Sequence, residues 1–397
     1  MPVIRQEMGL TPEQIANIAI ASVAMTIFAR LLIGWLCDKI GPRLCYVGLL
    51  IFGAIPVIGI GFAHEYSSFL IFRLCIGIIG ASFVITQYHC SIMFAGNCVG
   101  TANAITASWG NVGGGITQMV MPALLTLFVS FGVSEALGWR LAMVVPGVLM
   151  LVMGVLYYFF TQDTPKGNFN QILITHSHSN KVPFSEALKN YRVWILALVY
   201  GSCFGVGLTI YNMASLYFTD RFQLSITQAG MAAGVFGFMA IFARALGGYL
   251  GDRVGKKWGL RGRVFCLSSI LAIESVTLIL FSQSNTLFLA IVTLVLMAIS
   301  MHMSCGVTFS VTPFINKKAL GAVTGIVSAG GNLGAVLAGF LFKEFAWADS
   351  LAILGVTVAF VSALSFLIKF SPEDEVAAKH EIEKTHPTLI AETAGMY

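Results

Sequence analysis

Residues 30–43 read RLLIGWLCDKIGPR, and residues 244–257 read RALGGYLGDRVGKK. In both stretches an arginine is followed, at the same spacing, by a glycine, an aspartate, a basic residue, a second glycine and a second basic residue. A shorter echo follows each copy, Gly110-Asn111-Val112-Gly113 in the first half and Gly331-Asn332-Leu333-Gly334 in the second. The chain is therefore a duplicated unit, and each copy places an arginine inside a long apolar run.

The composition indicates a membrane protein. Of the 397 residues, 57% are hydrophobic and 10% charged, and the mean hydropathy is +0.84, whereas a soluble domain carries about 25% charged residues. The apolar runs reach the ~20 residues that a helix needs to cross a bilayer, and they lack the alternation of a barrel strand. We therefore expect an all-α, polytopic membrane protein. The eleven predicted helices cover 15–36, 45–63, 68–94, 101–130, 139–161, 193–218, 226–250, 264–283, 286–311, 320–343 and 349–370.

The loops between these runs predict the orientation, because short loops rich in Lys and Arg stay on the cytoplasmic side. One set of alternate loops holds thirteen basic residues, whereas the opposite set holds four. The first set contains Lys39, Arg43, Lys166, Lys181, Lys189, Arg192, Arg253, Lys256, Lys257, Arg261, Arg263, Lys317 and Lys318, and the second Arg5, Arg140, Arg221 and Lys343. The central linker and the C-terminus are thus predicted to be cytoplasmic.

These runs divide the chain into four parts. We predict an N-terminal bundle of five spans over 1–161, a cytoplasmic linker over 162–192, a C-terminal bundle of six spans over 193–370 and a cytoplasmic tail over 371–397. Five spans against six is unexpected in a duplicated protein. The pattern therefore predicts that one helix before Thr11 is missing and that the chain is a truncated form.

Several classes of function are disfavoured. The net charge of +5 is concentrated in the predicted cytoplasmic loops, which does not indicate a nucleic-acid partner. The eight cysteines form no CxxC pair, so we interpret them as packing residues and predict neither a metal site nor a cofactor. The sequence shows no nucleophile and base that would predict an enzyme.

The two repeated arginines carry the functional prediction. Arg30 lies eight residues before Asp38, which marks the cytoplasmic end of its helix, and this spacing places it roughly 12 Å deep. Half of a ~30 Å hydrocarbon core is about 15 Å. An arginine at that depth is costly unless it faces a cavity or a partner. A buried ion pair is the alternative, but no Asp or Glu of the first half lies near this depth.

Two such arginines without matching carboxylates predict an anion site. A guanidinium is planar, permanently charged and forked, which suits an oxyanion. One arginine from each half indicates a single small ligand clamped between Arg30 and Arg244, since transporters with internal repeats bind substrates at the repeat interface.

The glycine-rich segments allow two interpretations. No strand precedes them, so they are not phosphate-binding loops, and glycine in a membrane helix usually permits close helix contact. Close packing does not explain the paired Asn111 and Asn332. Their amides could bind the anion or restrain the glycine-rich backbone.

The chain resembles the nitrate/nitrite porters of the major facilitator superfamily, especially the eukaryotic-type high-affinity nitrate transporters. The resemblance covers nearly the whole chain, and the paired glycine segments are its most specific part. It rests on Ile20-Ala21-Ser22-Val23, Phe28-Ala29-Arg30-Leu31, Gly41-Pro42-Arg43, Trp109-Gly110-Asn111, Phe242-Ala243-Arg244-Ala245-Leu246-Gly247-Gly248 and Ala329-Gly330-Gly331-Asn332.

The resemblance implies a fold of two pseudo-symmetric helical bundles, here without the first helix. It implies that Arg30 and Arg244 bind the substrate, that Phe83 and Phe204 sandwich a planar anion, and that Tyr200 donates its hydroxyl to it. The expected function is nitrate import by alternating access across the plasma membrane, with nitrite as a second candidate substrate and protons as the coupling ion. The lipid bilayer and an accessory membrane protein are the further partners considered.

Two other functions stay open at this point: nitrate/nitrite antiport, and a nitrate sensor that does not transport. No carboxylate of the sequence explains proton coupling directly. Glu274 is expected on an outer helix of the fold, where a proton-carrying role is the less favoured interpretation. His89 and His302 are interpreted as satisfied interior residues.

Overall fold

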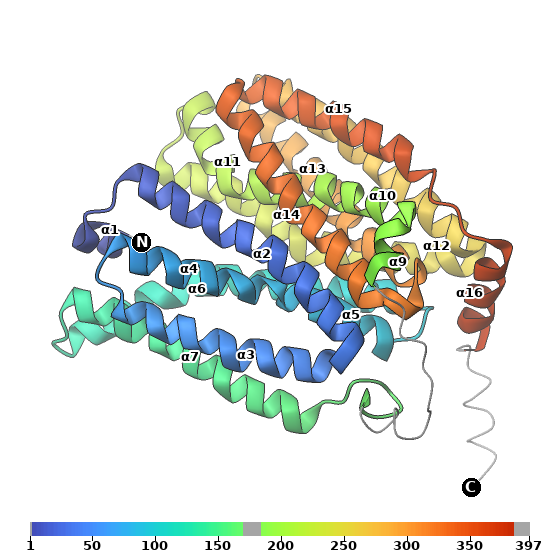
Figure 1. Ribbon diagram of the computed structural model, residues 1–397. Helices are drawn as coiled ribbons and strands as arrows, with labels where there is room; N and C mark the ends of the chain where they lie inside the picture. Colours follow the sequence, from blue (N-terminus) through green and yellow to red (C-terminus); the bar gives the residue numbers. More distant parts are fainter. Residues whose placement is uncertain (1, 170–183, 385–397) are drawn as a thin grey trace, which may run out of the picture. The chain divides into compact units, whose positions relative to one another are not determined.

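The computed structural model describes residues 2–169 and 184–384 (Figure 1). Over these ranges the regular elements are helices, and no strand is present. The all-α prediction is therefore confirmed. The first elements are α1 (Pro2–Met8), α2 (Pro12–Ile40), α3 (Pro42–Gly59), η1 (Ile60–Phe62), α4 (Tyr66–Gly77), η2 (Ile78–Ala81), α5 (Ser82–Met93), α6 (Val99–Ser130) and α7 (Glu135–Phe160).

The later part of the chain is helical in the same way. It ends in a short helix within the predicted tail. Its elements are α9 (Phe184–Lys189), α10 (Tyr191–Tyr200), η3 (Gly201–Gly205), α11 (Val206–Phe222), α12 (Ile226–Ser282), α13 (Leu287–Val311), η4 (Thr312–Phe314), η5 (Lys317–Ala319), α14 (Leu320–Glu344), α15 (Trp347–Ser365) and α16 (Pro372–Lys384).

The predicted spans fall on these helices. Nine helices in the described part of the chain are long and apolar enough to cross a membrane. The longest, Gln228–Ser282, is two helices joined at Gly259, where φ is +68° and the chain turns. It therefore accounts for two predicted runs, and α6 accounts for the eleventh.

The two arginine helices begin in the same way. Thr11 and Gln14 form a capping box at the start of α2, and Ser225 and Gln228 form one at the start of α12. In each box the hydroxyl accepts from the Gln backbone N–H while the Gln side chain accepts from the cap residue, which satisfies two donors at the helix start. The duplication thus extends to the signals that start the helices.

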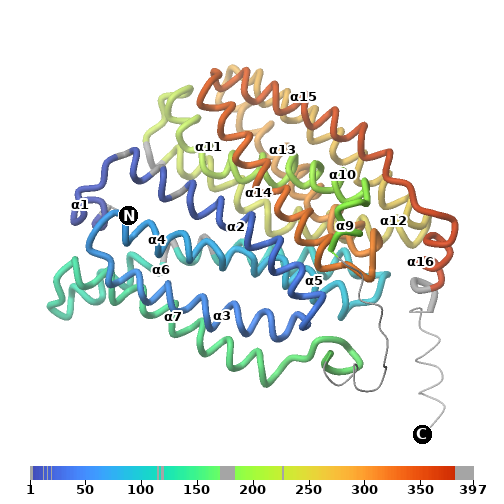
Figure 2. Tube along the Cα trace, in the orientation of Figure 1, coloured from blue at the N-terminus to red at the C-terminus, as the bar shows by residue number. Residues whose placement is uncertain are grey.

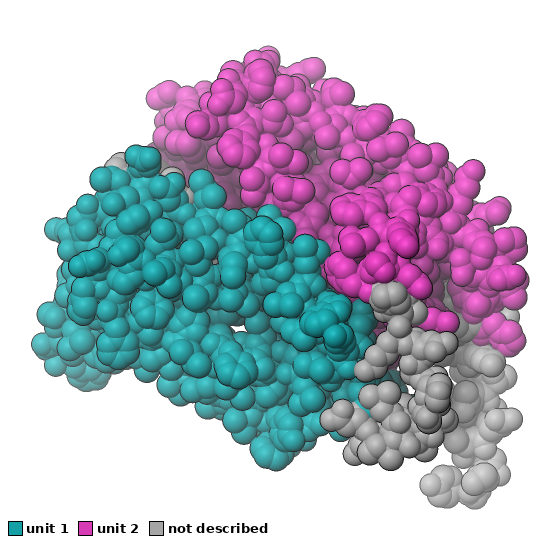
Figure 3. Space-filling model, in the orientation of Figure 1, with its two compact units in different colours: residues 1–89, 110–181 teal, residues 90–109, 182–397 magenta. Residues whose placement is uncertain are grey.

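The chain forms two compact units (Figure 3). One contains residues 1–89 and 110–181, and in it α3 and α7 run side by side (Figure 2). The other contains residues 90–109 and 182–397. The end of α5 and the start of α6 therefore pack with the second unit, although the sequence assigns them to the N-terminal bundle.

Short polar segments outside the predicted spans also have defined places. In the predicted linker, the Asp163 carboxylate accepts from the backbone N–H of Arg43 at 2.9 Å. In the predicted tail, Glu375 of α16 accepts from the N–H of Leu260 at 2.9 Å, beside the turn at Gly259. The His176 and His178 pair of the linker lies outside the described residues.

Candidate functional site

Arg244 is buried in the second unit, with 1% of its surface exposed. Its Nη2 donates to the Tyr200 hydroxyl at 3.0 Å. Its Nη1 is also buried but has no hydrogen-bond partner among the residues that the structure describes. A buried charged nitrogen without a partner is costly, so this nitrogen is available for a ligand.

Aromatic rings form one wall beside Arg244. Tyr200 and Phe204 stack with centroids 5.0 Å apart and an interplanar angle of 4°. The Arg244 Cζ atom lies 5.7 Å from the Phe204 centroid, within cation–π range. Both rings stand where α10 passes into η3, which is a π-helical turn over Gly201–Gly205. Such turns are frequent at functional sites. This one brings Tyr200 and Phe204, four positions apart, into parallel stacking.

The glycine-rich segment of α14 packs directly behind these rings. A Cβ atom added at Gly331 would lie 2.6 Å from Tyr200 Cδ1 and 2.9 Å from Phe204 Cδ1. One added at Gly334 would lie 2.3 Å from the Gly201 carbonyl oxygen. The glycines therefore permit the close helix contact that supports the ring wall. Asn332 lies buried on the same helix, between these two glycines.

Arg30 has related surroundings in the first unit. It is 5% exposed, its Nε donates to the Gly80 carbonyl at 3.4 Å, and its Cζ lies 5.3 Å from the Phe83 centroid. The Thr26 hydroxyl, one turn earlier on α2, donates to the Gly77 carbonyl at 2.7 Å. Each unit thus contains a buried arginine against the ring of a phenylalanine named from the sequence.

The first glycine segment differs from the second. Asn111 is exposed on α6, and no other side chain or helix lies within 4 Å of a Cβ added at Gly110 or Gly113. The structure brings together Arg244, Tyr200 and Phe204, and separately Arg30 and Phe83. It does not enclose Asn111 in the part of the chain that it describes.

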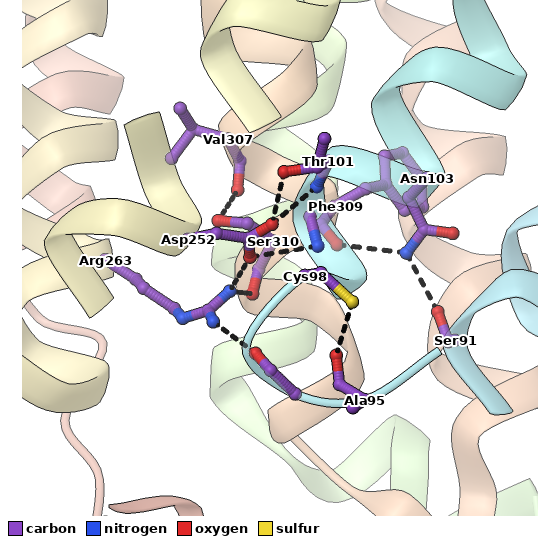
Figure 4. Close-up of polar contacts among 12 residues, drawn as sticks. Ser91, Ala95, Cys98, Thr101, Asn103, Asp252, Arg263, Val307, Phe309 and Ser310 are labelled. Carbon is purple, nitrogen blue, oxygen red and sulfur yellow. Dashed lines mark hydrogen bonds and ion pairs between the residues drawn. The ribbon is translucent and has the colours of Figure 1, made fainter. Parts of the chain in front are cut away.

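The aspartate of the second repeat has a structural role (Figure 4). Asp252 Oδ1 accepts from the Gly100 N–H at 3.0 Å and from Arg263 Nη1 at 2.8 Å. Its Oδ2 accepts from the N–H and hydroxyl of Thr101 at 2.6 and 2.7 Å. The carboxylate therefore caps the N-terminus of α6, where negative charge is favourable. Sequence reasoning missed Arg263 and Thr101, and the repeated aspartate was the only signal pointing to them.

Further ionisable side chains surround Arg244. The thiol of Cys305 lies beside its guanidinium, and the thiol of Cys203 lies beside Cys305. His302 Nε2 is 3.3 Å from the Phe236 carbonyl oxygen. In the first unit, His89 contacts the Tyr157 hydroxyl at 2.5 Å and the Gln162 carbonyl at 2.8 Å. Both histidines have interior partners, as the sequence predicts.

Glu274 departs from the sequence-based expectation. The sequence places it on an outer helix, but its side chain is 0% exposed. The reason is that the helix after Gly259 packs against both α13 and α15, so a residue of an outer helix can still face inward.

Comparison with known proteins adds a family. The model of the Major Facilitator Superfamily matches residues 1–316. High affinity nitrate transporter 2.5 of Arabidopsis thaliana is 38% identical over 346 residues, which are 86% of this chain and 69% of the relative. Nitrate transporter 2.2 of Chlamydomonas reinhardtii is 36% identical, with coverage of 85% and 67%. The Nitrate/nitrite transporter NrtP of Nostoc punctiforme is 28% identical, with coverage of 84% and 80%.

Solved structures show the same fold. The FucP transporter in its outward conformation superimposes with a TM-score of 0.69 at 15% identity, covering 94% of each chain. The proton:xylose symporter XylE superimposes with a TM-score of 0.67 at 15% identity, covering 92% of this chain and 90% of XylE. At these identities the likeness concerns the fold alone.

Proposed function

The chain belongs to the Major Facilitator Superfamily and, within it, to the high-affinity nitrate transporters, and we propose that it carries nitrate across a membrane by alternating access. The observation that carries this proposal is the unpartnered Nη1 of the buried Arg244, beside the stacked rings of Tyr200 and Phe204. A buried cation with an open donor and no ion-pair partner suits a small anion.

Nitrate fits the chemistry of these side chains. It is planar and trigonal, so it can accept hydrogen bonds from a guanidinium edge while its face lies against an aromatic ring. We propose that Arg30 and Arg244 both bind the anion, that Phe83 and Phe204 contact its two faces, and that Tyr200 donates a hydrogen bond to it. Asn332 and its repeat counterpart Asn111 are proposed as the amide contributors.

Proton coupling is the proposed energy source, because nitrate entering a cell must move against an inside-negative potential. Nitrite is proposed as a second substrate, which the name of the Nostoc relative supports. Nitrate/nitrite exchange remains the second candidate mode for the same reason. We place the protein in the plasma membrane, with the linker and the C-terminus cytoplasmic as the basic loops predict, and with an accessory membrane protein as a further candidate partner.

Counterflow in proteoliposomes tests the proposal without any assumption about coupling. Vesicles with purified protein and loaded with unlabelled nitrate should take up labelled nitrate, and external nitrite should compete. Sulfate and phosphate at the same concentration should not compete, because a tetrahedral anion does not fit between two ring faces. The absence of nitrate counterflow, or equal competition by sulfate, would contradict the proposal.

A further inference from the structure

Glu274 is a carboxyl group in an unusual place. It lies near the middle of the helix that follows Gly259, and its side chain is completely buried. Both of its carboxyl oxygens lack a hydrogen-bond partner in the described residues. The nearest polar group is Ser304, but the Ser304 hydroxyl donates to the Ser300 carbonyl at 3.0 Å instead.

An ionised carboxylate is not stable in such surroundings. Burial removes its hydration, and here neither a donor nor an adjacent cation replaces the lost water. The side chain is therefore a neutral acid in this conformation. A buried acid with no structural hydrogen bond contributes little to the packing that an apolar residue of the same size would not contribute, so its presence needs another explanation.

Two thiols connect Glu274 to the candidate anion site. Cys305 of α13 lies next to Glu274 and next to the Arg244 guanidinium. Cys203 of η3 is within electrostatic range of both groups as well. Arg244 and Glu274 thus share the same two neighbours in the interior of the second unit.

The other titratable groups of the packed elements have separate places. Among the described residues, α15 carries only Asp349, in its first turn, and α16 approaches α12 at Gly259. His302 of α13 lies towards Arg244 and Phe236. The remaining groups, on α11, are Tyr211, Tyr217, Asp220 and Arg221.

We propose that Glu274 is the proton-carrying residue of the transport cycle and that it takes up its proton together with nitrate binding at Arg244. The electrostatic reason is direct. An ionised Glu274 would place a negative charge near Arg244 and weaken its attraction for an anion, whereas the neutral acid leaves the positive charge of Arg244 uncompensated. Binding is reciprocal, so an anion that binds better when Glu274 is protonated must also favour its protonation.

This linkage would make transport productive against the membrane potential. Nitrate together with one proton carries no net charge, so the inside-negative potential does not oppose the loaded step. The sign follows from the same argument: nitrate affinity should be highest at low pH and should fall as pH rises through the titration of Glu274. The inference rests on the proposed nitrate transport and adds the residue that couples it to protons.

Proteoliposomes separate coupling from exchange. The substitution Glu274→Gln keeps the shape and the neutral state of the side chain but cannot release a proton. We expect nitrate counterflow to stay within about twofold of the native protein, proton-driven nitrate accumulation to fall at least tenfold, and nitrate affinity to lose its pH dependence. Glu344→Gln, at the exposed end of α14, is the matched control and should behave as the native protein in each assay.

The outcomes distinguish the two levels of the argument. Absence of counterflow in the native protein would overturn the transport proposal and the proton site with it. Counterflow in the native protein together with undiminished accumulation by Glu274→Gln would overturn the proton site alone.

A measurement on the native protein covers the case in which Glu274→Gln fails to fold. Addition of nitrate to the purified native protein in weakly buffered solution should take up about one proton for each nitrate bound. Nitrate binding without proton uptake at any pH would overturn the proposal.

Discussion

The two glycine–asparagine segments have nearly the same sequence but different surroundings. In α14, Gly331 and Gly334 lie against Tyr200, Phe204 and the backbone of Gly201. In α6, no other side chain or helix lies within 4 Å of the Cβ positions of Gly110 and Gly113. Asn332 is buried, whereas Asn111 is exposed.

The difference shows that a partner helix gives these glycines their function. The segment in α14 supports the ring wall because α10 and η3 approach it closely. The described part of the chain supplies no corresponding partner for the segment in α6. The same residues therefore build a site in one half and form an open helix face in the other.

Substitution of one glycine in each segment should break this comparison most strongly. Gly334→Ala would place a methyl group 2.3 Å from the Gly201 carbonyl oxygen, and neither backbone can yield cheaply. Overpacking of this kind costs roughly 1–3 kcal/mol. Gly113→Ala adds a methyl group in open space and should change stability by less than about 0.5 kcal/mol. Thermal unfolding of the purified variants measures both effects, and an equal loss of stability in the two would show that our account of the segments is wrong.

A smaller effect is expected from the rings. Phe204 and Phe83 each lie near a buried arginine, but only Phe204 is stacked on a second ring, that of Tyr200. Alanine at either position should weaken nitrate binding by about tenfold, the equivalent of about 1.4 kcal/mol, and Trp should be better tolerated than Ala. Titration of nitrate binding to the purified variants checks this. Native affinity in both alanine variants would exclude contact between the rings and the anion.

The fold could be predicted well because the bilayer imposes a simple requirement. Each of the predicted runs, including 226–250 and 264–283, falls on a helix, since length and hydropathy suffice to identify a span. The arginines were identified for a related reason: a charge at mid-depth is costly and therefore conspicuous in the sequence.

The details of the site depend on which face of each helix meets its neighbour, and local sequence does not specify this. The π-helical turn at Gly201–Gly205 aligns Tyr200 with Phe204, yet nothing in its composition indicates a change of helix type. Glu274 was assigned to an outer position from the order of the helices alone. Its burial became visible only from the packing of α13 and α15 around it.

The bonds of Asp252 show the same limit. The repeat identifies the aspartate, but its partners Gly100, Thr101 and Arg263 are distant in the sequence or follow a turn. The resulting network also explains why residues 90–109 pack with the second unit.

Nitrate affinity of Arg-to-Lys variants tests the central claim most directly. Lysine keeps the charge but loses the planar fork, so Arg244→Lys and Arg30→Lys should each weaken nitrate binding to the purified protein by at least tenfold while the protein still folds. Arg253→Lys makes the same chemical change at an exposed position of the repeat and should leave the affinity unchanged. Near-native nitrate affinity in Arg244→Lys would contradict the account, because the open nitrogen of Arg244 would then not be where the anion binds.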